Sequence, residues 1–215
     1  MLLQFANDLV EKSGFLAATR KVSSLIDILE IGTPAIIANG IELVAEARRF
    51  FPQQTLLADI KIVDAGYLEA ELAFERGADI VTVLGCASDE TINQAIRAAR
   101  VFDGRVMLDT VGTDNLKSIM NRAAAICPDY VCLHTPSDKS RVGETDFVQL
   151  VRRDMAVIRE NLPETRIAVA GGISPESLEL LLPLKPDVVI VGRFIYESEA
   201  PREAASRIRK AMVSV

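Results

Sequence analysis

Eight short apolar runs alternate with longer stretches of helical period along the chain, and this alternation is the strongest constraint on the fold. Val, Ile and Leu dominate the runs, as strands buried on both faces require. The predicted strands are residues 2–6, 26–31, 55–60, 80–84, 105–108, 130–133, 166–170 and 188–191. The predicted helices are residues 40–51, 68–76, 91–101, 114–125, 146–160, 175–182 and 201–213.

Strand-then-helix units without a change in composition predict an α/β fold, namely a single (β/α)8 TIM barrel over residues 1–215. A doubly wound open sheet is the alternative, but it usually has fewer strands at this length. Hydrophobic residues make up 49% of the chain and aromatic residues only 5%, so aliphatic side chains must fill the core. That balance favours parallel strands covered on both faces.

Charge and cysteine usage narrow the range of partners and compartments. The 24 Lys and Arg against 30 Asp and Glu give a net charge of −6, with no basic run and no Trp, so a nucleic-acid partner has little support. Cys86, Cys127 and Cys132 show no CxxC spacing, which indicates a reducing compartment. Asp8 comes too early for a signal peptide, and no apolar run is long enough to span a membrane. We therefore expect a cytoplasmic protein.

Polar side chains follow the predicted strands at their carboxyl ends, where barrels of this kind carry their chemistry. They are Asp8, Glu30, Asp59 with Lys61, Thr82 inside its strand, Asp109, His134 and Arg193. Glycines accompany them at Gly85, Gly171-Gly172 and Gly192. A charge that follows a buried strand is costly unless it is paired, hydrogen-bonded or bound to a metal. A single acid of this kind is often a helix cap or part of an ion pair. Four acids, a lysine and the sole histidine at one end of the barrel favour a functional site.

The spacing Asp59-x-Lys61-x-x-Asp64 is the most informative motif. On an extended strand Asp59 and Lys61 share a face, so both can point into the mouth of the barrel, and Asp64 falls in the following loop. An ammonium between carboxylates stays protonated and offers a fixed positive charge to a developing oxyanion. A surface salt-bridge run is the alternative, which the apolar residues 56–58 before the motif disfavour.

Two further groups of residues indicate a metal and a proton-transfer group. Glu30 and Asp59 end adjacent strands, and paired carboxylates suit Mg²⁺. Zinc has poor support, because one histidine and scattered cysteines do not make a tetrahedral nitrogen and sulfur set. His134 ends the sixth predicted strand, and imidazole is the side chain best suited to proton transfer near neutral pH.

Glycine motifs follow the seventh and eighth predicted strands. Gly171 and Gly172 come after the seventh, and Gly192 with Arg193 after the eighth. These two loops form the usual phosphate site of such barrels, because glycines let backbone N–H groups approach an anion. Arg193 could add a charged contact to the phosphate, or be an ordinary surface residue.

These residues resemble the orotidine 5′-phosphate decarboxylase superfamily over essentially the whole chain, and in particular its formaldehyde-adding aldolase branch. The segments that carry the resemblance are residues 3–8, 28–34, 57–69, 77–85, 168–173 and 187–193, with the Asp-x-Lys-x-x-Asp signature among them. The resemblance implies that Glu30 and Asp59 hold Mg²⁺ and that Lys61 steadies an enediolate. It also implies that Asp64 reaches across a homodimer interface into the partner's site.

The resemblance further implies that Asp8, Asp109 and His134 are active-site residues, with His134 a candidate proton-transfer group. The implied reaction is Mg²⁺-dependent aldol addition of formaldehyde to D-ribulose 5-phosphate, giving D-arabino-hex-3-ulose 6-phosphate. A related branch decarboxylates 3-keto-L-gulonate 6-phosphate through the same kind of enediolate. Asp109, Ser137 and residues 66–70 favour the aldolase, whereas Arg193 is more typical of the decarboxylase and Pro136 replaces a usual glycine.

Two other hypotheses remain open from the residues. Lys61 could act as a Schiff-base nucleophile without metal, although neighbouring carboxylates raise rather than lower the pKa of a lysine. The barrel could also bind phosphosugars without catalysis, although no expected charged position is missing from the chain.

Overall fold

The computed structural model describes residues 1–113, 116–135 and 144–213, and eight parallel strands within these ranges close into one barrel. Each strand pairs with the next, and β8 pairs back with β1 through Leu2 and Val188. The strands are β1 (Leu2–Asn7), β2 (Ile28–Ile31), β3 (Thr55–Ile62), β4 (Ile80–Leu84), β5 (Arg105–Asp109), β6 (Tyr130–His134), β7 (Arg166–Ala170) and β8 (Val188–Val191). The predicted (β/α)8 TIM barrel is confirmed, and the open sheet was the wrong alternative.

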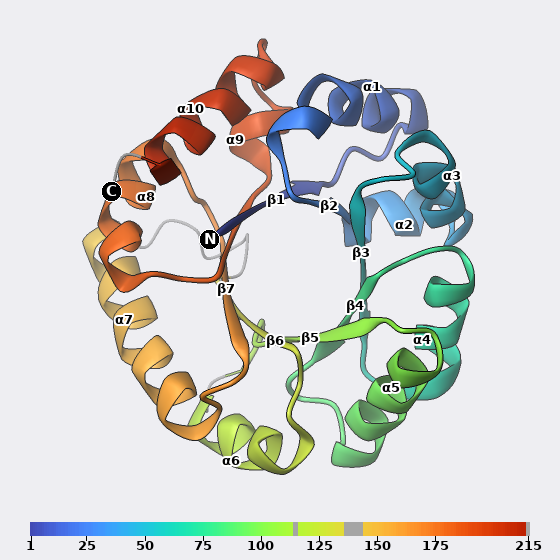
Figure 1. The fold of residues 1–215 in the computed structure, drawn as a ribbon, viewed down its shortest axis with the longest axis vertical. Coiled ribbons are helices and arrows are strands. Elements are labelled where there is room, and N and C mark those ends of the chain that lie inside the picture. Colours follow the sequence, from blue (N-terminus) through green and yellow to red (C-terminus); the bar gives the residue numbers. More distant parts are fainter. Residues whose placement is uncertain (114–115, 136–143, 214–215) are drawn as a thin grey trace.

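Helices surround the strands in an outer ring (Figure 1). They are α1 (Lys12–Val22), α2 (Thr33–Asn39), α3 (Glu42–Phe50), α4 (Gly66–Glu75), α5 (Asp89–Val101), α6 (Leu116–Ile126), α7 (Glu144–Asn161), α8 (Pro175–Leu181), α9 (Arg193–Tyr196) and α10 (Pro201–Val213). The last helix, α10, packs against α1 and so closes the ring. No helix in the described ranges is long and apolar enough to cross a membrane.

The structure adds three helices to the seven predicted ones. α1 begins after Glu11, whose carboxylate accepts hydrogen bonds from the backbone of Ser13 and Gly14, a cap outside the usual Ser, Thr, Asp and Asn set. α2 ends at Gly40, where φ is 74°, so residue 40 closes one helix instead of opening the next. α9 has four residues, too few for a periodic pattern. Residues 114–115 of one predicted helix lie outside the described ranges.

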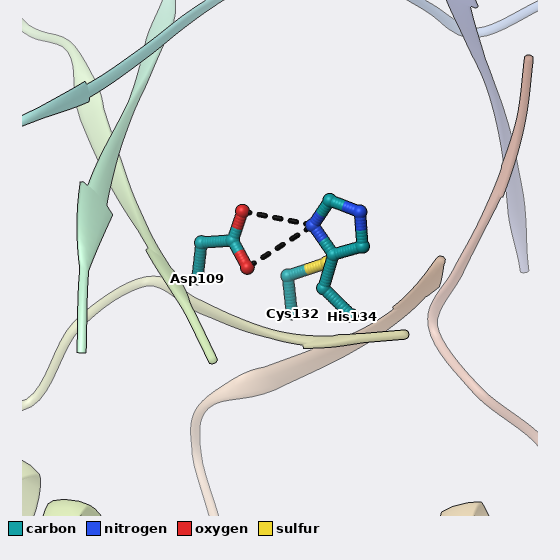
Figure 2. A group of neighbouring side chains, drawn as sticks. All are labelled: Asp109, Cys132 and His134. Carbon is teal, nitrogen blue, oxygen red and sulfur yellow. Dashed lines mark hydrogen bonds and ion pairs between the residues drawn. The ribbon is translucent and has the colours of Figure 1, made fainter. Parts of the chain in front are cut away.

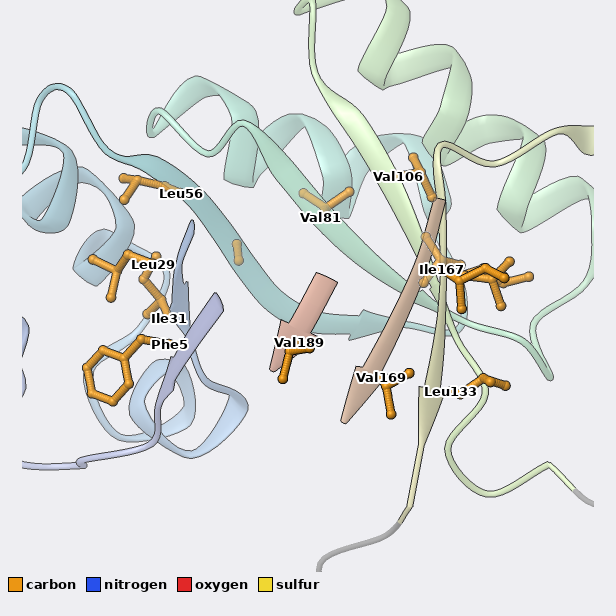
Figure 3. Close-up of a cluster of buried hydrophobic side chains, with 14 of the residues drawn as sticks. Phe5, Leu29, Ile31, Leu56, Val81, Val106, Leu133, Ile167, Val169 and Val189 are labelled. Atoms are coloured by element: carbon orange, nitrogen blue, oxygen red, sulfur yellow. The ribbon is translucent and has the colours of Figure 1, made fainter. Parts of the chain in front are cut away.

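Two layers of apolar side chains form the core. Phe5, Leu29 and Leu56 belong to the outer layer, between the barrel and its helices (Figure 3). The inner layer fills the barrel itself and comprises Ile28, Leu57, Ile80, Met107, Tyr130, Cys132, Ala168, Ala170, Val188 and Ile190. Because side chains alternate along a strand, the next inward positions beyond this layer are those at the carboxyl ends. The inner apolar layer therefore forms the floor beneath the side chains at the carboxyl ends of the strands.

An aspartate directly precedes each even-numbered strand and binds the strand before it. In each case the carboxylate accepts a hydrogen bond from the backbone N–H of the second residue of that neighbouring strand. The four pairs are Leu3 N to Asp27 at 2.7 Å, Leu56 N to Asp79 at 2.7 Å, Val106 N to Asp129 at 2.9 Å and Ile167 N to Asp187 at 2.8 Å. These acids lie at the amino ends of the strands and satisfy backbone donors that the ladders leave unpaired.

Asp79 offers a test of this structural role, because it binds both Leu56 N and the guanidinium of Arg48, the latter at 2.6 Å. D79A should lower the free energy of unfolding by about 1–3 kcal/mol, since it leaves a buried N–H without an acceptor. D79N should lose less, because an amide oxygen still accepts. The measurement is urea unfolding, with E164A at an exposed loop position as the control, expected within about 0.5 kcal/mol of the parent. Equal losses in D79A and E164A would contradict the assigned role.

Candidate active site

A cavity of about 280 Å³ opens at the carboxyl ends of the strands. Its lining includes Asp8, Glu30, Asp59, Lys61, Asp109, His134, Gly171, Gly172, Gly192 and Arg193. The structure thus brings together the whole predicted set apart from Asp64. That carboxylate is exposed in the β3–α4 loop, where it accepts a hydrogen bond from Ala65 N at 2.8 Å. Ser137 and Pro136 lie outside the described residues.

Lys61 lies between two buried carboxylates. Its Nζ is 3.0 Å from Oδ2 of Asp59 and 2.9 Å from Oδ2 of Asp109. As expected from strand alternation, Lys61 and Asp59 point to the same side. The backbone is not a regular strand there, because the β3–β4 register shifts between Ala58 and Ile62 and Lys61 has φ of 49°. The Lys61 N–H instead donates to the hydroxyl of Thr82 at 2.9 Å, which anchors the distorted segment to β4.

The charges of this cluster keep the lysine protonated. Burial alone would lower the pKa of Lys61, but the nearby carboxylates of Asp59 and Asp109 outweigh it and raise the pKa above its ordinary value. Burial likewise would raise the pKa of Asp109, but the hydrogen bond from His134, together with the positive charge of Lys61, lowers it. The ammonium is therefore a permanent positive charge at the floor of the cavity. This arrangement disfavours Lys61 as a nucleophile, which must be an uncharged amine.

Glu30 and Asp59 form an all-oxygen pair beside Lys61. Glu30 accepts a hydrogen bond from the amide of Gln4 at 2.5 Å, and Oδ2 of Asp59 accepts one from the hydroxyl of Thr33 at 2.8 Å. Burial, and then repulsion from Asp59, raise the pKa of Glu30 well above its ordinary value. A divalent cation would offset both effects, and carboxylate oxygens are the ligands that Mg²⁺ prefers. The residues therefore fit a magnesium ion.

His134 is oriented by Asp109. Its Nδ1 lies 2.9 Å from Oδ2 and 3.2 Å from Oδ1 of that carboxylate, and the other ring nitrogen points away from it (Figure 2). An Nδ1–H that donates to a carboxylate leaves Nε2 with a lone pair, so the neutral ring can accept a proton there. The sulfur of Cys132 lies beside the same ring. Asp109 thus holds both the lysine and the histidine.

The β7–α8 and β8–α9 loops form the wall of the cavity. At Gly171 φ is 112°, and a Cβ would come within 2.7 Å of the carbonyl oxygen of Thr135, so only glycine fits. Gly172, Gly192 and Arg193 border both the cavity and an adjoining groove of about 620 Å³. Residues that can offer backbone and guanidinium donors to an anion therefore line this part of the cavity.

Asp8, at the end of β1, faces the acidic pair from the other side. Its carboxylate lies 3.4 Å from the hydroxyl of Tyr196 on α9, which can donate to it. Burial, and then the negative charge of Asp59, raise the pKa of Asp8. This contact joins the first and last strand–helix units of the barrel at the site.

Sequence reasoning missed four residues of the site: Gln4, Thr33, Cys132 and Tyr196. A signal existed for two of them. Gln4 is a polar residue inside an apolar strand. Cys132 stands two residues before His134, so strand alternation turns the Cys132 and His134 side chains toward the same side of the sheet. Thr33 and Tyr196 reach the site from helices that the sequence pattern did not predict.

The fold and the site define a closed barrel whose strand ends carry a lysine–carboxylate cluster and two glycine loops around one cavity. The model of the orotidine 5′-phosphate decarboxylase / HUMPS family matches residues 1–208, and the chain belongs to that family. It is 36% identical over 213 residues to a 3-hexulose-6-phosphate synthase of Bacillus subtilis (strain 168), with 99% of each chain covered. The protein is thus an enzyme of this family, with aldehyde-lyases among its relatives.

Comparison with solved structures supports the same family assignment. A crystal structure of 3-hexulose-6-phosphate synthase superposes with a TM-score of 0.91 at 31% identity, covering 99% of this chain and 100% of that one. A KGPDC (3-keto-L-gulonate-6-phosphate decarboxylase) from Streptococcus mutans, solved as a ligand complex, superposes with a TM-score of 0.88 at 26% identity, covering 98% of this chain and 96% of that one. Both reaction classes considered from the sequence therefore have close structural counterparts.

The pKa of Glu30 predicts how stability depends on pH in the metal-free protein. Because the folded state holds the Glu30 proton more tightly than the unfolded state, the free energy of unfolding should fall as pH rises above the ordinary glutamate pKa. Each unit of pKa shift costs about 1.4 kcal/mol, fully developed above the folded-state pKa. E30Q should remove this part of the pH dependence.

The measurement is urea unfolding in EDTA at about pH 5 and about pH 8. E164Q, at an exposed loop position, is the matched control and should keep the wild-type slope. A slope in E30Q equal to that of the wild type would contradict the prediction.

Proposed function

We propose that the protein catalyses Mg²⁺-dependent aldol addition of formaldehyde to D-ribulose 5-phosphate, giving D-arabino-hex-3-ulose 6-phosphate. The observation that carries the proposal is the ammonium of Lys61, fixed between Asp59 and Asp109 beside the Glu30–Asp59 oxygen pair and opposite the glycine loops. Such a site combines an anion anchor with a positive charge where an enediolate would form. The similarity to 3-hexulose-6-phosphate synthases supports the same reaction.

In the proposed reaction the substrate phosphate binds at Gly171, Gly172, Gly192 and Arg193. Glu30 and Asp59 would hold the Mg²⁺, which would supply a Lewis acid that makes the C1 proton easier to remove. Nε2 of His134 removes the C1 proton, while Asp109 holds the ring in the tautomer that can accept it.

Lys61 then stabilises the negative oxygen of the enediolate. Carbon C1 attacks the carbonyl carbon of formaldehyde, and the enediolate oxygen returns to a ketone as the new carbon–carbon bond forms. The formaldehyde oxygen then takes up the proton that His134 removed from C1. Because the ammonium stays protonated throughout, it contributes charge and not a covalent bond. A metal-free Schiff-base route would require the opposite state of Lys61, and borohydride would then trap the substrate on the protein.

The proposed working unit is a homodimer in which Asp64 completes the partner's site. In the sequence of the β3–α4 region, the exposed Asp64 follows Val63 and precedes Leu68, two apolar residues with exposed fractions of 54% and 55%. An acid held outside its own cavity among exposed apolar groups is suited to a contact with a second copy.

Loss of Lys61 tests both the mechanism and the shared site. K61A should slow exchange of the C1 proton of D-ribulose 5-phosphate with solvent deuterium by at least about 100-fold, as measured by NMR. K12A, which removes an exposed lysine paired with Glu46, should exchange at the wild-type rate. Undiminished exchange in K61A would contradict the role of the ammonium.

Mixing K61A with D64N extends this test to the dimer. A heterodimer of the two variants contains one site with both Lys61 and a partner Asp64. If subunits exchange freely, the mixture should regain about a quarter of the wild-type activity, since half the dimers are mixed and each has one complete site. A mixture no more active than its separate components would contradict a shared site.

A second candidate function is decarboxylation of 3-keto-L-gulonate 6-phosphate. It is favoured by Arg193, which borders the cavity, and by the similarity to the KGPDC structure. With Mg²⁺ present, turnover of D-ribulose 5-phosphate plus formaldehyde should exceed turnover of 3-keto-L-gulonate 6-phosphate, and EDTA should abolish it. The reverse preference would favour the decarboxylase, and tight binding of D-ribulose 5-phosphate without turnover or exchange would favour a non-catalytic barrel.

A further inference from the structure

Three different ligand types meet at the ends of β5 and β6, where they line the cavity. A carboxylate oxygen of Asp109, the sulfur of Cys132 and a ring nitrogen of His134 all lie within 4.8 Å of one another (Figure 2). All three residues line the cavity, so the space between them is continuous with it.

The backbone fixes this arrangement. Asp109 and Cys132 are directly opposite each other in the β5–β6 pairing. His134 follows Cys132 by two residues on β6 and therefore points to the same face of the sheet. The group is consequently a product of strand register and not of a chance meeting of surface side chains.

The geometry and donor set suit a tetrahedral, thiophilic ion. Ligand atoms around such an ion are roughly 3.3–3.8 Å apart, as follows from metal–ligand distances of about 2.0–2.3 Å. Nδ1 of His134 and Oδ2 of Asp109 are 2.9 Å apart and all three ligand atoms lie within 4.8 Å of one another, so small side-chain rotations can reach this spacing. Sulfur and nitrogen donors prefer Zn²⁺ and Cd²⁺, whereas the oxygen-only pair of Glu30 and Asp59 prefers Mg²⁺.

We propose that Asp109, Cys132 and His134 form a second cation site, specific for thiophilic divalent ions such as Zn²⁺ and Cd²⁺, whose occupation blocks the active site. Binding forms a metal–sulfur bond and releases the thiol proton to solvent, while neutral His134 and ionised Asp109 contribute lone pairs. No redox partner is needed.

A bound ion would inhibit the enzyme because it would replace the contacts that Asp109 makes with Lys61 and His134. Asp109 now binds Nζ of Lys61 and Nδ1 of His134, each at 2.9 Å. An ion coordinated by Asp109 and His134 would remove the hydrogen bond that orients the ring and weaken the contact that holds Lys61. Because Mg²⁺ prefers oxygen ligands, excess Mg²⁺ would compete poorly for a group that includes a sulfur and a ring nitrogen.

The other two cysteines allow a sharp experiment. Cys86 and Cys127 are exposed, so C86S/C127S leaves Cys132 as the sole thiol. In excess Mg²⁺, titration of this variant with CdCl2 should produce the ultraviolet charge-transfer absorption of a cadmium–sulfur bond, saturating at one ion per chain. Adding C132A or C132S should abolish the absorption, and H134N should weaken Cd²⁺ binding at least about tenfold.

Inhibition provides the second readout. Cd²⁺ should inhibit C86S/C127S, and the added C132A and C132S changes should each relieve that inhibition at least about tenfold. Circular dichroism checks that both variants fold. Lack of the absorption in C86S/C127S, equal inhibition of the Cys132 variants, or full reversal by Mg²⁺ would overturn the proposal. The absorption needs no turnover, so its outcome is independent of whether the proposed aldol reaction is right.

Discussion

The ion-pair bridge from Asp59 through Lys61 to Asp109 is the interaction on which the rest of the site depends. It joins the ends of β3 and β5 across the mouth of the barrel, and Asp109 extends it to His134 on β6. Buried charges of this kind are costly one by one and tolerable only as a satisfied network. The hydroxyls of Thr33 and Thr82, which both bind Asp59, complete that network.

The barrel separates structural from chemical acids by the end of the strand at which they stand. Acids at the amino ends, such as Asp79, bind backbone N–H groups of neighbouring strands and hold the ladder in register. Acids at the carboxyl ends, such as Glu30 and Asp59, line one cavity, where the charge of Asp59 helps to raise the pKa of Glu30. The apolar layer inside the barrel keeps the two sets apart, so the site can be tuned without altering the register.

Much of this organisation could be predicted from the sequence because it follows from short periods. All eight strands were predicted from short apolar runs between helical stretches, and the inward direction of Lys61 from the two-residue repeat that it shares with Asp59. The left-handed backbone at Lys61 could not be predicted, because a lysine rarely adopts it and tertiary contacts impose it. Thr33 on α2 and Tyr196 on α9 could not be predicted as site residues either, because those helices are too short to show a periodic pattern in the sequence.

Closure of the barrel through β1 and β8 has a consequence for how the protein is made. The first site acid, Asp8, meets its phenol partner only at Tyr196, and the anion loop at Gly192 follows the strand that pairs with β1. A ribosome must therefore deliver nearly the whole chain before any of this chemistry exists. Until then the amino-terminal strand lacks its neighbour and offers an open edge. The nascent protein is inactive by topology, and it acquires its site in the same step that removes its edge.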